Sequence, residues 1–147
     1  MDISETIRAI ISQEPEREVM EWQGKWWRRG ALRAFAASLT AELDRLNVER
    51  DMAIAFSARN RPTHCFAILS LLAQDRPISM LYAYQAAESL ARDIDKTRFA
   101  VFILDQEDWS EEVAAAAERT GTPVIVLGAL PEDGFRTVEP TTRGDLS

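Results

Sequence analysis

A short basic run follows the first strongly apolar, strand-like segment of the chain. Arg59, Asn60 and Arg61 stand between that segment and an apolar run that begins at Pro62. Guanidinium groups beside a helix N-terminus can hold an anion or a carboxylate, which would make this turn a binding site. The alternative is an ordinary turn, in which Asn60 takes an unusual backbone conformation and both arginines are solvated. We favour the ordinary turn, because no complete catalytic or phosphate-binding set accompanies it.

An acidic run follows a second apolar segment, at 99–104. Asp105, Glu107 and Asp108 could bind a magnesium ion, or serve as an acid–base pair. A loop rich in acids between a strand and a helix can also simply be solvated and cap the helix. We favour the solvated loop here as well.

His64 and Cys65 are the only histidine and the only cysteine of the chain. Adjacent residues of a helix point about 100° apart, so these two side chains do not face each other as a catalytic pair must. We expect a structural role for His64 and no metal site, because the usual four ligands are absent. A single cysteine cannot form an internal disulfide, which favours a reducing compartment.

The glycines argue against a nucleotide site within this chain. All six are dispersed, and neither G-x-G-x-x-G nor G-x-x-x-x-G-K-[ST] occurs. A phosphate cradle depends on closely spaced glycines, so the sequence predicts no catalytic residue and no cofactor-binding residue here.

The elements that would position these polar runs alternate between strand and helix. Apolar strand patterns occur at 52–57, 77–81, 99–104 and 123–127, and helical patterns at 62–73, 85–95 and 110–119. Strands apolar on both faces predict an α/β fold, a three-layer sandwich with a mainly parallel sheet of about four core strands and helices on both faces. Residues 128–147 lack an apolar period and are expected to be a polar tail or severed linker after a subdomain at 1–127.

Three further elements are predicted before the first core strand. Asp2 caps a short helix, Val19–Trp27 forms a β-hairpin turning at Gln23-Gly24, and 30–46 forms an amphipathic helix. The hairpin tryptophans at 22, 26 and 27 could stack on a planar ligand, but packing against the following helix is commoner. An exposed Trp26 would instead indicate a partner surface.

Composition narrows the class of protein. The net charge is -7 and the pI is near 4.8, with scattered arginines, which argues against nucleic-acid binding. No apolar run is long enough to span a bilayer, and the start is unlike a signal peptide. We therefore expect a cytoplasmic protein that does not bind membranes.

The order of these segments resembles the N-terminal part of the AMP-forming acyl-CoA synthetases, the adenylating superfamily that includes nonribosomal adenylation domains and luciferases. The segments that carry the resemblance lie between Val19 and Leu127, at 31–39, 46–51, 54–56, 59–62, 69–73 and 77–81.

The resemblance implies a parent enzyme that activates a carboxylate with ATP to an acyl-adenylate and transfers it to CoA, with magnesium as a cofactor. The phosphate loop and catalytic lysine of the family lie beyond the matching segments, so the chain alone is expected to be inactive and to bind none of these cofactors. It would be an N-terminal fragment whose partner is the rest of the ligase. Asn60, His64, Tyr82 and Tyr84 are the candidates for one wall of the acyl or nucleotide crevice.

A non-enzymatic α/β module that binds a protein partner, or forms a homodimer, is the alternative. Its contact surface would be an exposed sheet edge together with the tryptophan hairpin.

Overall fold

The computed structural model of the chain describes residues 2–96 and 98–144. Within them the main sheet has five strands in the spatial order β4-β3-β5-β6-β7. In chain order these are β3 (Ile54–Ser57), β4 (Ile78–Leu81), β5 (Val101–Asp105), β6 (Val124–Leu127) and β7 (Phe135–Val138). The first four are parallel and β7 is antiparallel to β6. The α/β class is confirmed, but the sheet is mixed and larger by one strand than expected.

The additional strand lies in the segment from which the sequence predicts only a polar tail. A 3-10 turn, η2 (Pro131–Asp133), leads through Gly134, at a φ of 66°, into β7. β7 is a half-buried edge strand that carries Arg136, so it lacks the apolar run that identified the other strands. Further on, the N–H of Gly144 donates to the carbonyl of Gly121, so the described chain folds back onto the end of a helix.

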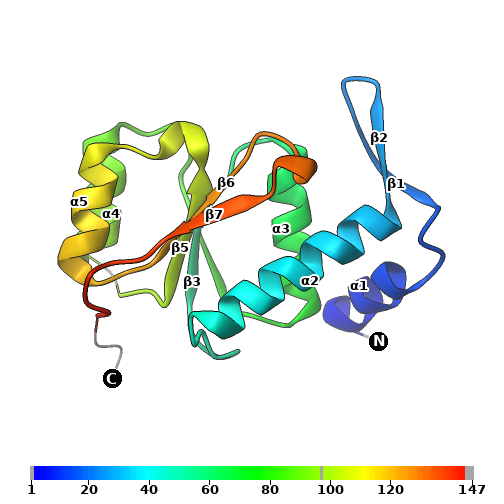
Figure 1. Cartoon of the computed structure of the whole chain (residues 1–147), viewed down its shortest axis with the longest axis horizontal. Helices are drawn as coiled ribbons and strands as arrows, with labels where there is room; N and C mark the ends of the chain where they lie inside the picture. Colours follow the sequence, from blue (N-terminus) through cyan, green and yellow to red (C-terminus); the bar gives the residue numbers. More distant parts are fainter. Residues whose placement is uncertain (1, 97, 145–147) are drawn as a thin grey trace.

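Helices cover both faces of the sheet (Figure 1). One face carries α2 (Arg29–Arg45) and α3 (Pro62–Ala73), with α1 (Ile3–Ser12) packed against both. The other face carries α4 (Ala87–Lys96) and α5 (Glu111–Thr120), which pack against each other. This is the predicted three-layer arrangement.

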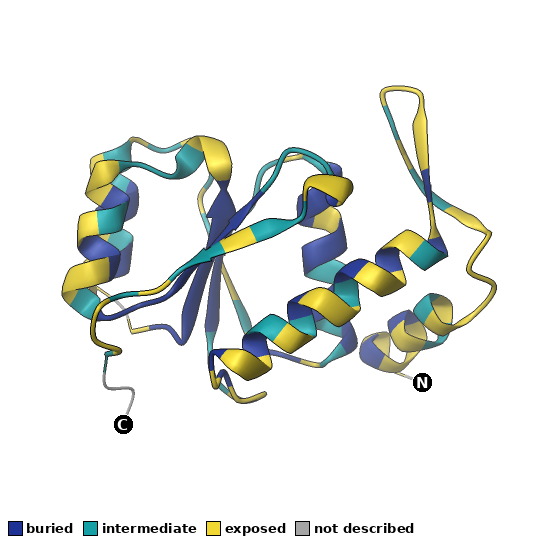
Figure 2. Cartoon of the chain, in the orientation of Figure 1, coloured by how far each residue is buried: buried dark blue, intermediate teal, exposed yellow. Residues whose placement is uncertain are grey.

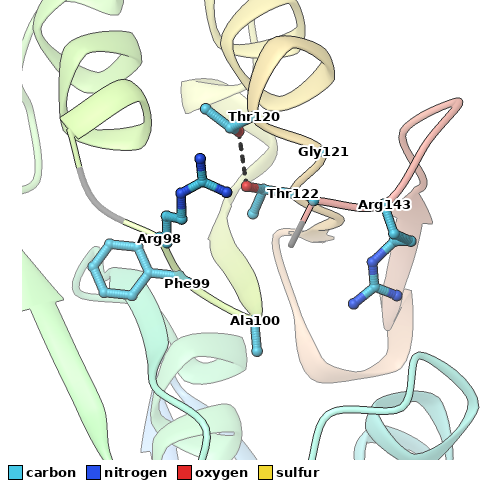
Figure 3. A pocket seen from close by; sticks show the side chains of 8 residues that line it. Arg98, Phe99, Ala100, Thr120, Gly121, Thr122 and Arg143 are labelled. Carbon is cyan, nitrogen blue, oxygen red and sulfur yellow. Dashed lines mark hydrogen bonds between the residues drawn. The ribbon is translucent and has the colours of Figure 1, made fainter. Parts of the chain in front are cut away.

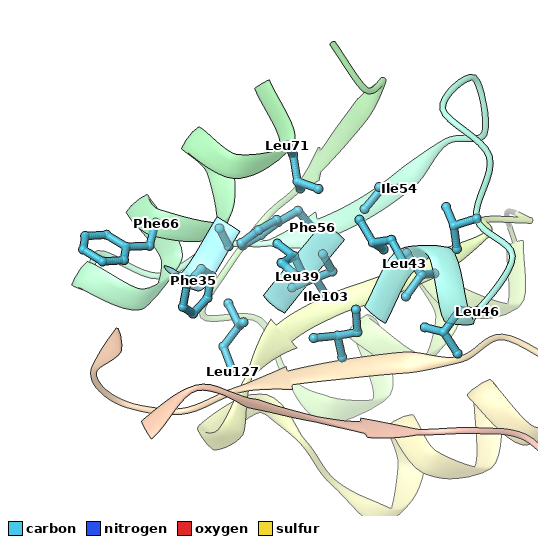
Figure 4. Packing of buried hydrophobic residues seen from close by; sticks show 14 of the residues in the cluster. Phe35, Leu39, Leu43, Leu46, Ile54, Phe56, Phe66, Leu71, Ile103 and Leu127 are labelled. Carbon is cyan, nitrogen blue, oxygen red and sulfur yellow. The ribbon is translucent and has the colours of Figure 1, made fainter. Parts of the chain in front are cut away.

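Alternate residues of the central strands enter two separate apolar layers, as the two-residue period of a strand requires. Phe56 and Ile103 pack toward α2 and α3, whereas Ala55, Phe102 and Leu104 pack toward α4 and α5. The centre of the sheet is accordingly buried along its whole length (Figure 2), and the first layer is filled by interleaved leucine and phenylalanine side chains (Figure 4).

The predicted helix starts are confirmed by their capping contacts. The Asp2 carboxylate accepts the N–H of Glu5 at 2.8 Å, and the Ser110 hydroxyl accepts the N–H of Val113 at 3.2 Å. Pro62 is the first residue of α3, where a missing N–H costs nothing. In the described ranges no helix combines the length and the apolarity that a membrane span needs.

The predicted hairpin is formed by β1 (Glu18–Trp22) and β2 (Lys25–Arg28), and it extends away from the body of the molecule (Figure 1). Gln23 and Gly24 take φ values of 52° and 84°, the positive pair that a two-residue hairpin turn requires. Trp27 is buried against α2, whereas Trp26, on the opposite face, is 54% exposed. The hairpin is therefore anchored by one tryptophan and presents another to solvent.

Candidate functional site at the switch point of the sheet

The strand order places the two polar runs of the sequence side by side. The chain passes from β3 to β4 on one side, and β5 then returns to the other side of β3. Ligands of open α/β sheets bind at such a switch point, beyond the carboxyl ends of the strands. Six residues meet there, and we call them the switch-point cluster: Arg59, Arg61, His64, Asp105, Glu107 and Asp108.

Arg59 is held by two carboxylates and an aromatic ring. Its Nε and Nη2 donate to the two oxygens of Asp108 at 2.9 and 2.8 Å, and its Nη1 donates to Glu107 at 3.0 Å. The guanidinium carbon lies 4.7 Å from the centre of the Tyr84 ring. The paired hydrogen bonds that Arg59 donates to Asp108 raise the pKa of Arg59 further above its already high ordinary value. This arginine is fully committed to neighbours within the chain.

Arg61 is also paired, with the carboxylates of the loop after β5. Its Nη2 lies 2.9 Å from Glu107, and its Nη1 lies 3.4 Å from Asp105, whose carboxylate has no solvent exposure. The same oxygen of Asp105, Oδ2, also accepts the N–H of Glu107 at 2.9 Å, at the start of the 3-10 turn η1 (Gln106–Asp108). A single buried carboxylate thus ties the loop after β3 to the loop after β5.

His64 completes the connection between the two loops. Its Nδ1 accepts the N–H of Arg59 at 2.9 Å, so the proton of the neutral ring sits on Nε2 and is donated to Asp105 at 2.9 Å. The side chain is 1% exposed. Burial lowers the pKa of His64 below its ordinary value, and the bond to Asp105 only partly opposes this. The imidazole is therefore a neutral link between the two loops, whereas the sequence predicts only a structural role for it.

The structure corrects two details of the expected turn. The arginines are not solvated, because Arg59 and Arg61 have side chains only 16% and 23% exposed and both contact carboxylates. Asn60 does not take the expected unusual conformation: the non-glycine residues at positive φ in the described ranges are Gln23, Asn47, Asp75 and Tyr84. The acidic loop is likewise paired with the arginines and not simply solvated.

The four predicted crevice residues are divided between two environments. His64 is buried, whereas Asn60 is exposed and Tyr82 and Tyr84 are 77% and 64% exposed. His64 belongs to the cluster, and of the three exposed side chains Tyr84 contacts it, through Arg59. Their assignment to a crevice wall stays a prediction.

The cross-pairing of the two runs is what the sequence analysis missed. Each run was weighed alone, although both follow strands that a parallel sheet can place side by side. The basic run after one strand and the acidic run after another could have indicated these ion pairs. That inference requires the order of the strands in the sheet, which the sequence leaves open.

The chemistry open to the cluster is limited by this pairing. Each arginine contacts two carboxylates, so neither is free to hold an anionic ligand without breaking ion pairs. The carboxylates face cations that the chain itself supplies. In the part of the chain that the structure describes, no group of three or more metal-ligating side chains is placed to bind an ion. The cluster acts as a brace between two loops.

Two of the hollows in the described structure lie away from the cluster and are lined by contrasting residues. One, at the opposite end of β5, has a volume of about 10 Å³, which is room for about one water molecule. Figure 3 shows it between Arg98, Phe99, Thr120 and Thr122. The hydroxyl oxygens of Thr120 and Thr122 are 2.8 Å apart. The other is an open groove of about 510 Å³ between the hairpin, α2 and η2. The ion pair of Lys25 and Glu132 lies beside its wall.

Comparisons with known proteins identify the fold. No family model matches the sequence, and a search of curated proteins gives no match. Among solved structures, a benzoate CoA ligase from Burkholderia xenovorans matches over 100% of this chain and 30% of its own, at a TM-score of 0.70 and 14% identity. Apo MatB from Rhodopseudomonas palustris matches over 90% of this chain and 29% of its own, at a TM-score of 0.68 and 16% identity. The luciferase-like enzyme of the mealworm Zophobas morio matches over 98% of this chain and 33% of its own, at a TM-score of 0.66 and 7% identity.

The chain has the fold of a part of the AMP-forming ligases, the enzyme class to which the segment order pointed. It spans about a third of the length of these similar proteins. At these identities the likeness concerns the fold alone.

Proposed function

We propose that the chain is a structural subdomain of an AMP-forming carboxylate–CoA ligase. In the parent protein, a carboxylate would attack ATP to give an acyl-adenylate and pyrophosphate, and the acyl group would then pass to the thiol of CoA with release of AMP. ATP, magnesium and CoA would be bound by segments outside this chain. The observation that carries the proposal is the match to a benzoate CoA ligase along the entire chain at a TM-score of 0.70. We propose a subdomain and not a complete enzyme, because the chain matches only about a third of the length of each of these proteins.

Within that ligase, the subdomain would contribute rigidity and not a reacting group. The switch-point cluster supports this role, because its arginines, carboxylates and histidine all bond to one another. Asn60, Tyr82 and Tyr84 are the exposed side chains near the same strand ends. We assign to them one wall of the acyl or nucleotide crevice, with His64 holding the loop beneath.

Two measurements test the proposal together. Titration calorimetry of this chain with ATP and with benzoate should give no binding heat. The coding sequence downstream of Ser147 should continue in frame into a Ser-, Thr- and Gly-rich phosphate loop, and the protein expressed from that longer frame should catalyse ATP–pyrophosphate exchange with a carboxylic acid. Tight ATP binding by the chain alone, or a stop codon directly after Ser147, would contradict the subdomain assignment.

A partner-binding module is the second candidate function, and the exposed Trp26 favours it. The indole of Trp26 is 54% exposed and lies close to the turn of a hairpin that projects from the molecule (Figure 1). Exposed tryptophans of this kind often anchor protein interfaces. If this role is correct, Trp26→Ser should abolish capture of a partner while leaving the fold intact by circular dichroism. Trp22, which packs on the apolar layer, is not a suitable comparison; Arg28→Ser, exposed on the same hairpin, is the matched control.

A further inference from the structure

The strand β4 forms one edge of the main sheet and has an unoccupied side. In the described ranges it pairs with β3 alone. The N–H of Ile54 donates to the carbonyl of Pro77, which fixes the alternation of the parallel ladder. The main-chain groups of Pro77 and Ser79 therefore face β3, and those of Ile78 and Met80 face outward. β4 thus offers donors and acceptors for a further strand.

The side chains around this edge are large, apolar or aromatic, and exposed. Met80 is 55% exposed, and Tyr82 and Tyr84 directly after the strand are 77% and 64% exposed. These three are half of the exposed large hydrophobic residues in the described chain; the others are Ile3, Ile10 and Trp26. Apolar surface is concentrated where the main chain is unpaired.

The strand at this edge is short, with four residues, but it carries no charge, proline or bulge that would prevent pairing. Proteins guard exposed edges with charged side chains, prolines within the strand or bulges. No charged residue occurs between Arg76 and Glu88, and β4 pairs with β3 in unbroken register. The opposite edge is different, because β7 carries Arg136 and is followed by Glu139. Of the two edges, only β4 is open to another strand.

We propose that two copies of this chain associate through β4, antiparallel about a two-fold axis perpendicular to the sheet, forming one continuous sheet. A chain of net charge -7 repels its own copy, and an isologous contact brings each residue near its own counterpart. The uncharged segment 77–87 is a surface where such a contact sets no like charges against each other. Met80 and Tyr82 of each copy would cover the edge of the other. The inference does not rest on the proposed ligase role, but in such a dimer Tyr82 would lie at the contact, so that only Asn60 and Tyr84 would remain for the crevice wall.

Sedimentation equilibrium of the chain tests this association. We expect a reversible dimer, and we expect Met80→Lys to raise its dissociation constant at least about tenfold, because the axis brings two lysines together. Met80→Leu should leave the constant within about threefold. Ala37→Lys, which adds the same charge on the exposed side of α2, is the matched control and should have little effect.

Hydrogen exchange on the unmodified chain gives a second readout that does not depend on any variant folding. The amides of Ile78 and Met80 should become protected as protein concentration rises, whereas that of Ser79 should not change. A chain that stays monomeric at about 1 mM would overturn the proposal. So would a dimer that Met80→Lys leaves intact and Trp26→Ser dissociates, or unchanged exchange at Ile78 and Met80. None of these results bears on ATP binding, so the proposed function is tested separately.

Discussion

Two regions beside β3, the apolar layer under α2 and α3 and the switch-point cluster, are built on opposite principles. The apolar layer under α2 and α3 contains leucine, isoleucine and phenylalanine side chains that contact many neighbours of the same kind, such as Leu39 and Phe66. The switch-point cluster contains six polar side chains, and each is held by named, short, directional contacts. One region excludes water by packing, and the other holds partly buried charges that are paired with one another.

The difference lies in how each region responds to a change. An apolar layer loses energy in proportion to the volume removed, and neighbours can relax into the gap. A buried charge that loses its partner keeps its full desolvation cost, and no relaxation of packing can replace the missing partner. The predictions below separate these two responses.

The largest effect is expected in the apolar layer, from Phe66→Ala. Phe66 has no solvent exposure, and its ring meets Phe35 edge-on with centroids 5.8 Å apart. Deleting it should lower the free energy of unfolding by about 4 kcal/mol, measured by urea denaturation. The neighbouring and exposed Cys65 gives the control, since Cys65→Ala should change stability by less than about 0.5 kcal/mol. Equal losses for both variants would refute the packing of this helix face.

The next effect is expected in the cluster, from Asp105→Asn. The amide keeps nearly the same shape but removes the charge that faces Arg61 and His64, so the loss should be about 3 kcal/mol. The same substitution at Asp95, which forms an exposed ion pair with Arg119 at 2.9 Å, should cost less than about 1 kcal/mol. Urea denaturation of both variants in parallel measures the difference. If Asp105→Asn is as mild as Asp95→Asn, the buried pairing is not what holds the two loops.

These two regions also differ in how far the sequence predicts them. The apolar layer follows from periodicity, because Leu32, Phe35, Leu39 and Leu43 repeat on one helix face and their role needs no partner to be known. The bounds of α3 were predicted to the residue for the same reason.

The cluster could not be predicted in that way. Arg59 and Asp108 are far apart in sequence, and their contact depends on β5 lying beside β3, which the local patterns do not determine. The strand β7 was not predicted from the sequence, for a related reason. It is stabilised by pairing with β6 and by a hydrogen bond between Thr137 and Glu42, not by an apolar pattern of its own. Features that consist of pairs, and not of single residues, need the topology first.

A smaller effect is expected when the geometry of a pair changes but its charge does not. Arg59→Lys keeps a cation beside Asp108 yet loses the two parallel hydrogen bonds and the flat contact with Tyr84, so it should cost about 1 kcal/mol. Arg28→Lys, at an exposed pair with Glu16, should be close to neutral. Thermal or urea unfolding resolves this difference. A neutral Arg59→Lys would show that charge alone, without the forked geometry, is sufficient at the switch point.

The smallest effect is a dependence of stability on pH that arises from His64. Burial holds the pKa of the folded imidazole below its ordinary value, whereas the unfolded chain takes up the proton near about pH 6.5. Between these two pKa values the unfolded state binds more protons, so the stabilisation is complete above about pH 6.5 and is lost as the pH falls through the folded pKa. The slope for one group is at most about 1.4 kcal/mol per pH unit.

This pH dependence can be assigned to one residue, because His64 is the only histidine of the chain. Urea denaturation between pH 7.5 and 5.5 should show a falling midpoint in the unmodified protein. His64→Gln should be less stable at pH 7.5 but should have a nearly flat profile, since the amide can still bridge Arg59 and Asp105 without titrating. A profile that keeps its slope in His64→Gln would place the titrating group elsewhere. It would also mean that the link between the two loops is not the neutral imidazole. A slope that disappears would show that this polar brace, unlike the apolar layer beside it, depends on the protonation of a single ring.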